Sequence, residues 1–343
     1  MCNIAGYVGE NEATPILLEM IKKQEGLNGG FFTGLATHNG DSLCYRKVQG
    51  ELATLLKETD ADRLKGNMGI IHSRTPSGGN ELWAHPFVTE RNGIVKMCYV
   101  ANGSRGIFKG NREKVNQIAD RLMAENFDIP CKIDFEGDKY CRLSGGEAVH
   151  TSDVMCQLIY KYKQNVKDTV SAMTSAFTEI PGEIVGLVIE EESSDRIYFS
   201  RINMPMFVGF DDHGAYLASS PIAFPNSVKN YKLLPPLSSG VVFKDHYEVT
   251  NYGEFPIEVA SFNDETVEDT ESLILTMLKA QECSYRDIVN ELKKNDTKEL
   301  LMQYNAIVYI ALSNLLDRKE IVMRSIYRTV DGQSAPKTLF RLT

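Results

Sequence analysis

Short apolar runs that stop at glycine, asparagine or aspartate recur along most of the chain and constrain its fold more than any other feature. Examples are NIAGYV (3–8), GEIVGLVIE (182–190) and GAYLASS (214–220). Runs of this length, bounded by such residues, predict strands. Turn signals such as THNGDS (37–42) favour antiparallel pairing of neighbouring strands. We therefore predict antiparallel sheets in residues 1–258.

Three segments between these runs have helical spacing. Apolar residues recur at helical intervals in 14–25, 151–165 and 168–180. In the first segment Thr14 is the expected N-terminal cap and Pro15 suits the first turn. The prediction for residues 1–258 is thus an α+β domain with helices interposed between antiparallel strands.

The pattern changes after residue 258. Residues 259–271 form an acidic stretch that we interpret as a linker or helix entry. Residues 272–343 contain three helical patterns and then two strand patterns around Asp331-Gly332. Ser284 and Asp287 resemble a capping box at the second helix. Helix, helix, helix, hairpin is the order of a winged helix-turn-helix, and we predict a small α+β domain of that kind.

Charge and cysteine content limit the class of protein. The net charge of -9 argues against binding to nucleic acid or acidic membranes over the whole surface. Residues 264–343 carry 13 acidic and 11 basic residues, so DNA binding by this part is not favoured. The seven cysteines form no metal-binding pattern, and no signal peptide or membrane span is evident. We expect a cytoplasmic protein with free thiols and no metal or organic cofactor.

Cys2 directly precedes the first predicted strand. Position 2 is usually part of a frayed terminus, so by itself the residue is weak evidence of function. If Met1 is removed, however, Cys2 carries a thiol and an α-amine on one residue. An α-amine has a pKa of about 7.7–8.0, so it can act as a base near neutral pH. We expect removal of Met1 in the cell.

Two other segments suit such a nucleophile. In IIHSRTPSGGNELWAHPF (70–87), Arg74 follows a strand and can hold a carboxylate, although it also reads as a surface arginine near a turn. In CYVANGSRGIF (98–108), the Asn102 amide and the Gly103 N–H are suitable oxyanion donors, although a bare Asn-Gly is more often a hairpin turn. His72, His85 and His150 are interpreted as packed or structural histidines.

Taken together, these segments resemble the class II glutamine amidotransferases, which are N-terminal-nucleophile (Ntn) hydrolases. The likeness is greatest to the glutaminase half of the glucosamine-6-phosphate synthases. It rests on the opening MCNIAGYVG, on HSRTPSGGNELWAHPF, on VANGSRGIF and on TSDVMCQLI, and covers about residues 1–245. The resemblance implies a four-layer αββα sandwich of two antiparallel sheets.

The resemblance also implies roles for individual residues. Cys2 would attack the side-chain amide of L-glutamine, and Asn102 with Gly103 would hold the oxyanion. Arg74 would pair with the substrate carboxylate, with Ser77 where the family has threonine, and Asp153 would pair with the α-ammonium. For Asp153 alone, a helix N-cap is the alternative.

The chain also departs from the family pattern. The family loop Arg-Gly-Tyr-Asp-Ser-Ala-Gly is NGGFFTG (28–34) here, and Asn3, Thr75 and Gly78 replace a glycine, a tryptophan and a histidine. We expect no sugar-isomerase domains in this chain, so ammonia would be released or passed to a separate synthase partner, and a homo-oligomer is compatible. The alternatives are a catalytically weak glutamine-sensing regulator with a winged-helix output domain, and an Ntn amidase for another amide.

Overall fold

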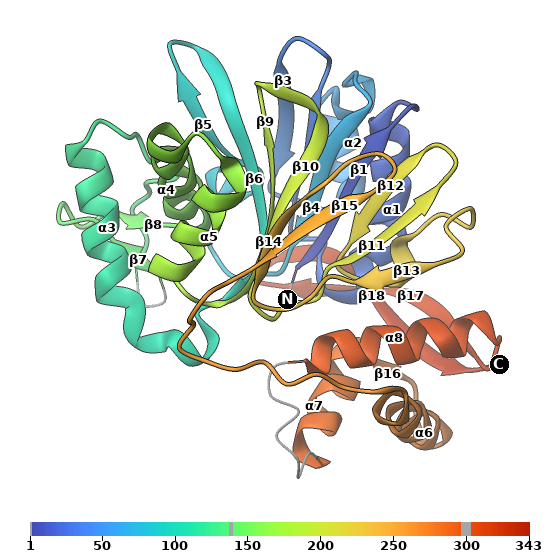
Figure 1. Cartoon of the computed structure of the whole chain (residues 1–343). Coiled ribbons are helices and arrows are strands. Elements are labelled where there is room, and N and C mark those ends of the chain that lie inside the picture. The colour runs from blue at the N-terminus through green and yellow to red at the C-terminus, as the bar shows by residue number, and fades with distance from the viewer. Residues whose placement is uncertain (1, 137–139, 296–302) are drawn as a thin grey trace.

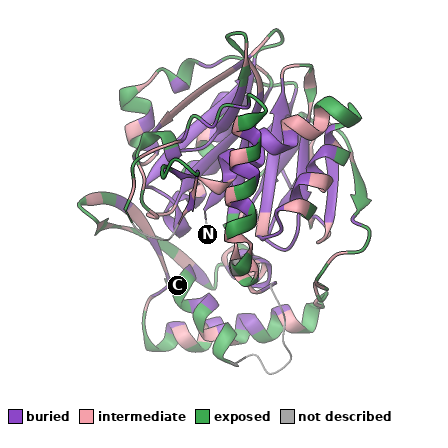
Figure 2. Ribbon diagram, turned by 90° about the vertical axis from the view of Figure 1, so that its left-hand side faces the viewer, coloured by how far each residue is buried: buried purple, intermediate pink, exposed green. Residues whose placement is uncertain are grey.

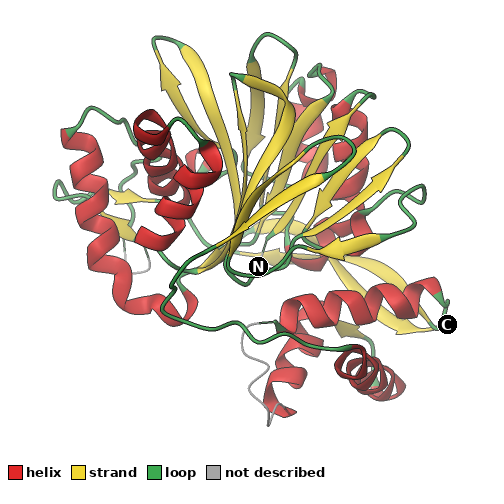
Figure 3. Ribbon diagram, in the orientation of Figure 1, coloured by secondary structure: helices red, strands yellow, loops and turns green. Residues whose placement is uncertain are grey.

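Two antiparallel sheets lie face to face at the centre of the molecule (Figures 1 and 3). The structure is a computed structural model that describes residues 2–136, 140–295 and 303–343. Among these residues, one sheet has the strand order β13-β11-β12-β1-β4-β2-β3 and the other β15-β14-β10-β9-β6-β5. All neighbouring strands in both sheets pair antiparallel, which confirms the prediction. The strands are β1 (Asn3–Gly9), β2 (Phe32–His38), β3 (Leu43–Val48), β4 (Met68–Arg74), β5 (Phe87–Arg91), β6 (Ile94–Ser104), β9 (Glu183–Glu190), β10 (Ser193–Arg201), β11 (Phe207–Asp211), β12 (Gly214–Ala218), β13 (Tyr231–Leu233), β14 (Ser238–Val242) and β15 (Tyr247–Asn251).

Helices cover the outer face of each sheet, so the molecule has four layers (Figure 3). Helices α1 and α2 lie on the sheet that contains β1, and α4 and α5 lie on the sheet that contains β6, with α3 packed against α4. Figure 2 shows buried strands inside and exposed residues on the outer helix faces. These helices are α1 (Ala13–Asn28), α2 (Leu52–Glu58), α3 (Arg112–Ala124), α4 (Thr151–Val166) and α5 (Thr169–Glu179), and the short pair β7 (Cys141–Arg142) and β8 (Ala148–Val149) lies beside them.

Strand β1 is buried on both faces because it is enclosed by two layers. Side chains alternate along a strand, so Ile4 and Val8 face the other sheet while Ala5 and Tyr7 face α1. The same alternation places His72 of β4 on the inter-sheet face, opposite Ile4. The first residues of β1 and the last residues of β4 therefore lie next to each other at one end of the strands.

One local prediction is wrong. Helix α1 begins at Ala13, so Thr14 is not its cap. The Thr14 hydroxyl instead donates to the Leu64 carbonyl at 2.6 Å. Glu12 precedes the helix without a side-chain capping bond. Tertiary contact with the segment before β4 thus decides where this helix starts.

The residues after 263 form a compact group of elements that packs against α1. In order they are α6 (Asp264–Ala280), β16 (Cys283–Ser284), α7 (Tyr285–Asn295), α8 (Tyr304–Asp317), β17 (Ile321–Val330) and β18 (Gln333–Leu342). The capping box is confirmed, since the Ser284 N–H donates to Asp287 Oδ2 at 2.9 Å and the Asp287 N–H donates to Ser284 Oγ at 3.4 Å. Apolar side chains of these elements share one continuous core with α1 and the β1 sheet.

The hairpin of β17 and β18 covers residues 28–34, which run from the last residue of α1 through a short turn into β2 and are called loop 28–34 below. Gln333 Nε2 donates to the Phe31 carbonyl at 2.7 Å, and Asn28 Nδ2 donates to the Tyr309 hydroxyl at 3.1 Å. Phe31, Phe32 and Ala335 lie together in a small buried cluster. The segment in which the chain departs from the family loop is thus the one that packs on the C-terminal elements.

None of the helices formed by the described residues combines the length and apolarity that a bilayer span requires.

Candidate active site

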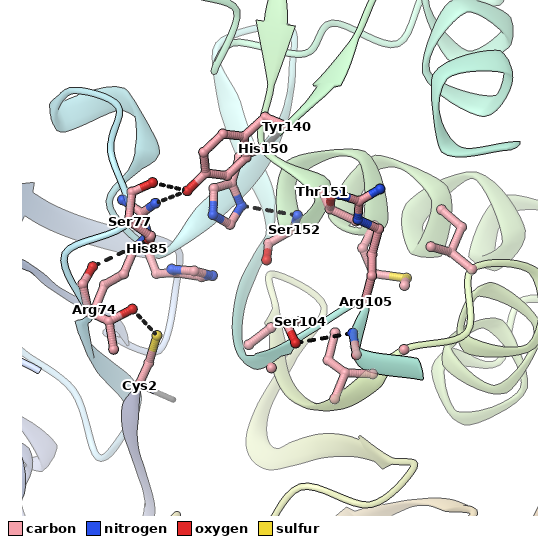
Figure 4. Close-up of a pocket in the computed structure, with 18 of the residues that line it drawn as sticks. Cys2, Arg74, Ser77, His85, Ser104, Arg105, Tyr140, His150, Thr151 and Ser152 are labelled. Atoms are coloured by element: carbon pink, nitrogen blue, oxygen red, sulfur yellow. Dashed lines mark hydrogen bonds between the residues drawn. The ribbon is translucent and has the colours of Figure 1, made fainter. Parts of the chain in front are cut away.

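A cavity of about 460 Å³ opens where β1 begins and where β4 and β6 end (Figure 4). Because β1 and β4 are antiparallel, the start of one meets the end of the other, and the neighbouring sheet contributes the end of β6. The cavity is lined by Cys2, Arg74, Thr75, Ser77, His85, Ala101, Gly103, Ser104, Arg105, Gly106, Tyr140, His150, Thr151, Ser152, Met155, Ile180, Pro181, Gly182 and Ile184. Four predicted site residues, Cys2, Arg74, Ser77 and Gly103, are therefore brought together around one cavity.

Cys2 is held at the inner end of this cavity. Its backbone N–H donates to Asn102 Oδ1 at 2.7 Å, and its sulfur lies 3.9 Å from the Thr75 hydroxyl. Burial raises the pKa of the thiol, but interaction with the His72 ring, together with smaller contributions from the N-terminal charge and the Thr75 backbone, outweighs burial, so that the pKa is lowered to about 6. A thiol with such a pKa is largely thiolate at pH 7, which is the nucleophilic form.

Asn102 and Gly103 lie within β6 and do not form a hairpin turn. Asn102 is fully buried, and its Nδ2 has no hydrogen-bond partner among the described residues. A buried amide donor without a partner is costly, and it is the kind of group that can receive an oxyanion. Gly103 has φ +154°, and a Cβ there would lie 2.2 Å from the Glu183 carbonyl oxygen. Only glycine fits so close to β9.

Arg74 is buried and fixed by three contacts. It donates to the Gly78 carbonyl at 3.0 Å and to the Tyr140 hydroxyl at 2.9 Å, and its guanidinium lies 4.5 Å from the centre of the Phe32 ring. Tyr140 in turn donates to the Ser77 carbonyl, as Figure 4 shows. These contacts fix the position of the guanidinium in the lining of the cavity, where it can attract a carboxylate.

Asp153 does not line the cavity. It lies in the first turn of α4 and is fully buried, and its carboxylate accepts bonds from the Cys131 N–H at 3.0 Å and from Gln157 Nε2 at 3.2 Å. Burial raises the pKa of Asp153. The N-cap of α4 is His150, whose Nδ1 accepts from the Ser152 N–H at 3.2 Å, so Asp153 is not the cap either.

Sequence reasoning missed two residues that line the cavity, His85 and His150. His85 is buried and His150 is half-buried, and desolvation of each ring lowers its pKa well below the usual range, so both rings are neutral at pH 7. The rings of His72, His85 and His150 form a chain, with centroid separations of 3.9 Å and 5.5 Å. In the sequence, the signal for these two residues was a histidine next to apolar residues.

Among the residues that the structure describes, no group of three or more His, Cys, Asp and Glu side chains could hold a metal ion.

Comparison with known proteins gives relatives by sequence. No family model matches the chain. The glutamine–fructose-6-phosphate aminotransferase (isomerizing) of Oceanobacillus iheyensis is 27% identical over 88% of this chain and 46% of the relative. The enzyme of the same name from Thermococcus kodakarensis is 22% identical over 91% of this chain and 49% of the relative. The chain therefore spans about half the length of these curated relatives.

Solved structures give the fold. The glutamine phosphoribosylpyrophosphate amidotransferase from B. subtilis superposes with a TM-score of 0.58 and 14% identity, over 94% of this chain and 66% of that one. A structure described as the allosteric regulatory enzyme of purine biosynthesis gives a TM-score of 0.59 at 14% identity, over 85% and 63%. The family resemblance seen in the sequence is thus confirmed: the chain is a homologue of the glutamine–fructose-6-phosphate aminotransferases and has a glutamine amidotransferase fold.

Proposed function

We propose that the chain hydrolyses the side-chain amide of L-glutamine to glutamate and ammonia through a thioester on Cys2. The observation that carries the proposal is the Cys2 thiol, which lines the cavity and whose pKa is lowered to about 6, next to Asn102, which accepts from the Cys2 N–H at 2.7 Å and whose Nδ2 has no partner among the described residues. A reactive thiol and an oxyanion donor at the same place are the two elements that acyl transfer requires.

The geometry supports a sequence of steps. Arg74 attracts the substrate carboxylate and directs the amide toward Cys2. The sulfur attacks the amide carbon, and the negative charge on the oxygen is received by Asn102 Nδ2 and the Gly103 N–H. Ammonia leaves, and water hydrolyses the thioester to release glutamate. With Met1 removed, the α-amine of Cys2 would lie next to Asn102 Oδ1, which already accepts from this nitrogen.

The test is ammonia and glutamate release from L-glutamine by protein whose N-terminus has been verified by mass. We expect equimolar products, abolished by Cys2→Ala. Cys44→Ala is the matched control, because Cys44 is a free, half-buried cysteine outside the cavity. Turnover that survives Cys2→Ala would contradict the proposal.

A second candidate substrate is an amide that has a carboxylate but no α-ammonium. The described cavity residues include Arg74 and Arg105 but no Asp or Glu, and Asp153 is engaged elsewhere. Glutaramate, the monoamide of glutaric acid, is L-glutamine without its ammonium group. If the protein does not bind the ammonium, kcat/KM for the two amides should agree within about tenfold. A preference for L-glutamine of 100-fold or more would exclude this candidate.

For the C-terminal part, we propose a winged-helix domain over residues 272–343. Residues 259–271, of which 264–271 form the first half of α6, join it to a catalytic domain over residues 1–258. The sheet order β16-β18-β17 and the order of the helices support this assignment. Most of α8, the third helix, is buried, and the hairpin packs on loop 28–34. These contacts favour an intramolecular role over DNA binding.

DNA binding can be tested directly by fluorescence anisotropy with a labelled duplex at low salt. We expect no saturable binding, because the third helix is not free to enter a groove. Affinity that falls steeply with salt would contradict this expectation.

Ammonia is proposed to be released or to reach a separate synthase. Copurification of such a synthase would identify the acceptor, and copurification of a second copy of this chain would identify the oligomeric state.

A further inference from the structure

His72 lies beside the nucleophile although it does not line the cavity. It is in β4, where it pairs with Ile4 of β1, and both residues face the other sheet. Cys2 is two residues before Ile4, so its side chain is on the same face as that of His72. Diagonal neighbours of this kind in an antiparallel pair are within reach of an imidazole ring.

The hydrogen bonds of His72 fix which ring nitrogen carries the proton. His72 Nε2 lies 3.0 Å from the Ala101 carbonyl oxygen, which can only accept, so Nε2 is the donor. In the neutral ring Nδ1 then has a lone pair. His72 is fully buried, and Nδ1 has no hydrogen-bond partner of normal geometry among the described residues. His72 Nδ1 is therefore a buried hydrogen-bond acceptor that is available to the Cys2 thiol.

The pKa of the Cys2 thiol is affected by this ring and by few other charged groups. The ionisable groups around it are the N-terminal ammonium, which also lowers the pKa of the thiol, His72, His85, Arg74 and, from α8, Tyr309, whose pKa is raised by burial and further by the Cys2 charge. Among them the His72 ring makes the largest contribution that lowers the pKa of Cys2. It does so with Met1 in place, where the Cys2 nitrogen is an amide that donates to Asn102 Oδ1 and has no basic lone pair.

We propose that His72 Nδ1 accepts the proton of the Cys2 thiol, so that the nucleophile is activated whether or not Met1 has been removed. The inference rests on the proposed role of Cys2 as nucleophile. The thiol proton passes to Nδ1 first, and the resulting thiolate then bonds to the amide carbon. The imidazolium then protonates the departing nitrogen, the C–N bond breaks, and ammonia leaves. Water attacks the thioester, its proton returns to the sulfur through Nδ1, and the acid is released.

The test measures the reactivity of Cys2 without any substrate, so it does not depend on glutaminase activity. Protein that retains Met1, prepared with methionine aminopeptidase inhibited and verified by mass, is alkylated with iodoacetamide from pH 5 to 9. Alkylation of the peptide that contains Cys2 is followed by mass spectrometry. Cys98, Cys131 and Cys156 are internal references, because burial raises their pKa and they should react little.

We expect a midpoint near pH 6 in the wild-type chain. In His72→Gln the amide nitrogen can still donate to Ala101, but the basic nitrogen is lost, and the midpoint should rise above pH 8.5. The rate at pH 7 should then fall about 30-fold or more, following the thiolate fraction. The matched control is His38→Gln, since His38 is also a buried histidine whose Nε2 meets a carbonyl, that of Glu191, at 2.9 Å, at the other end of the sheet.

Two results would overturn the proposal. One is a wild-type midpoint at pH 8 or above in the protein that retains Met1. The other is an unchanged midpoint in a folded His72→Gln protein. If that variant does not fold, as judged by its melting curve, the wild-type midpoint decides, and His72→Asn gives a second variant. Inactivity toward glutamine with a midpoint near pH 6 would refute the proposed function and leave the Cys2–His72 pair standing.

Discussion

At the scale of single residues, Asn102 connects two parts of the proposed chemistry. Its Oδ1 fixes the Cys2 backbone, and its Nδ2 has no partner among the described residues. A side chain used only for stability would have both ends satisfied. The unsatisfied end therefore indicates that binding or catalysis, rather than folding, determines this residue.

Substitution of Asn102 by alanine should separate activity from stability. The variant loses one oxyanion donor, so kcat should fall by about 10²–10³-fold. It loses only one satisfied hydrogen bond, so the free energy of unfolding should fall by about 1 kcal/mol. Steady-state kinetics and urea unfolding measure the two effects. A loss of stability of several kcal/mol, or a loss of activity below tenfold, would show that the residue is structural.

The sequence predicts those site residues that lie at the ends of predicted strands. Cys2, Arg74 and Gly103 meet in the cavity as predicted, because antiparallel pairing brings strand ends together. Asp153 and His85 could not be placed in this way. The direction of a buried side chain depends on partners far apart in sequence, such as the Cys131 N–H that Asp153 accepts from.

At the scale of elements, loop 28–34 is held between the end of β4 and the C-terminal hairpin. The Gly30 N–H donates to Ser73 Oγ at 2.7 Å, and the Phe31 N–H donates to the Arg74 carbonyl at 3.1 Å. On the other side, a Cβ on Gly30 would lie 2.9 Å from Pro336 Cδ. The departures from the family loop thus have a physical reason, which is close packing against the hairpin.

Gly30→Ala should displace the hairpin and disturb Arg74. Gly30 has φ +93°, so the substitution adds backbone strain of about 1–2 kcal/mol to the clash with Pro336. Gly40→Ala is the matched control, because Gly40 has φ +99° and open space around its Cβ. Both variants should lose similar stability from backbone strain, but only Gly30→Ala should lose activity and become protease-sensitive in the hairpin. Equal activity in the two variants would show that the loop does not support the site.

The element order was largely predictable because strands and helices here have clear periodicity and turns. The THNGDS turn and the Asp331-Gly332 turn are found between paired strands, with Gly40, Asp331 and Gly332 at positive φ. Packing between remote segments was not predictable. No local pattern indicates that residues 333–336 would cover residues 30–31.

At the scale of the whole molecule, Arg201 joins the sandwich to the C-terminal elements. The buried guanidinium donates to the carbonyls of Met204 at 2.7 Å and Asn203 at 3.1 Å, and to Gln303 Oε1 at 2.8 Å. Burial lowers its pKa to about 9. Since the hydrophobic core is also continuous with α1, we expect both parts to unfold together.

Calorimetry of the intact chain should therefore show one transition. Gln303→Ala leaves a donor of Arg201 unsatisfied and should lower the free energy of unfolding by about 1–3 kcal/mol. Gln117→Ala, on the exposed face of α3, is the control and should change it by less than about 0.5 kcal/mol. Two resolved transitions in the wild-type chain would mean that the two parts are thermodynamically independent.

The segment of residues 252–263, which connects β15 to α6, has a consequence for how firmly the hairpin must bind. A short tether keeps the C-terminal elements at an effective concentration on the order of millimolar near loop 28–34. An intrinsic dissociation constant of about 0.1 mM would then leave the loop covered about 90% of the time. A detached copy of these elements at micromolar concentration could not compete. Because the connection is covalent, the covering of the loop is insensitive to protein concentration.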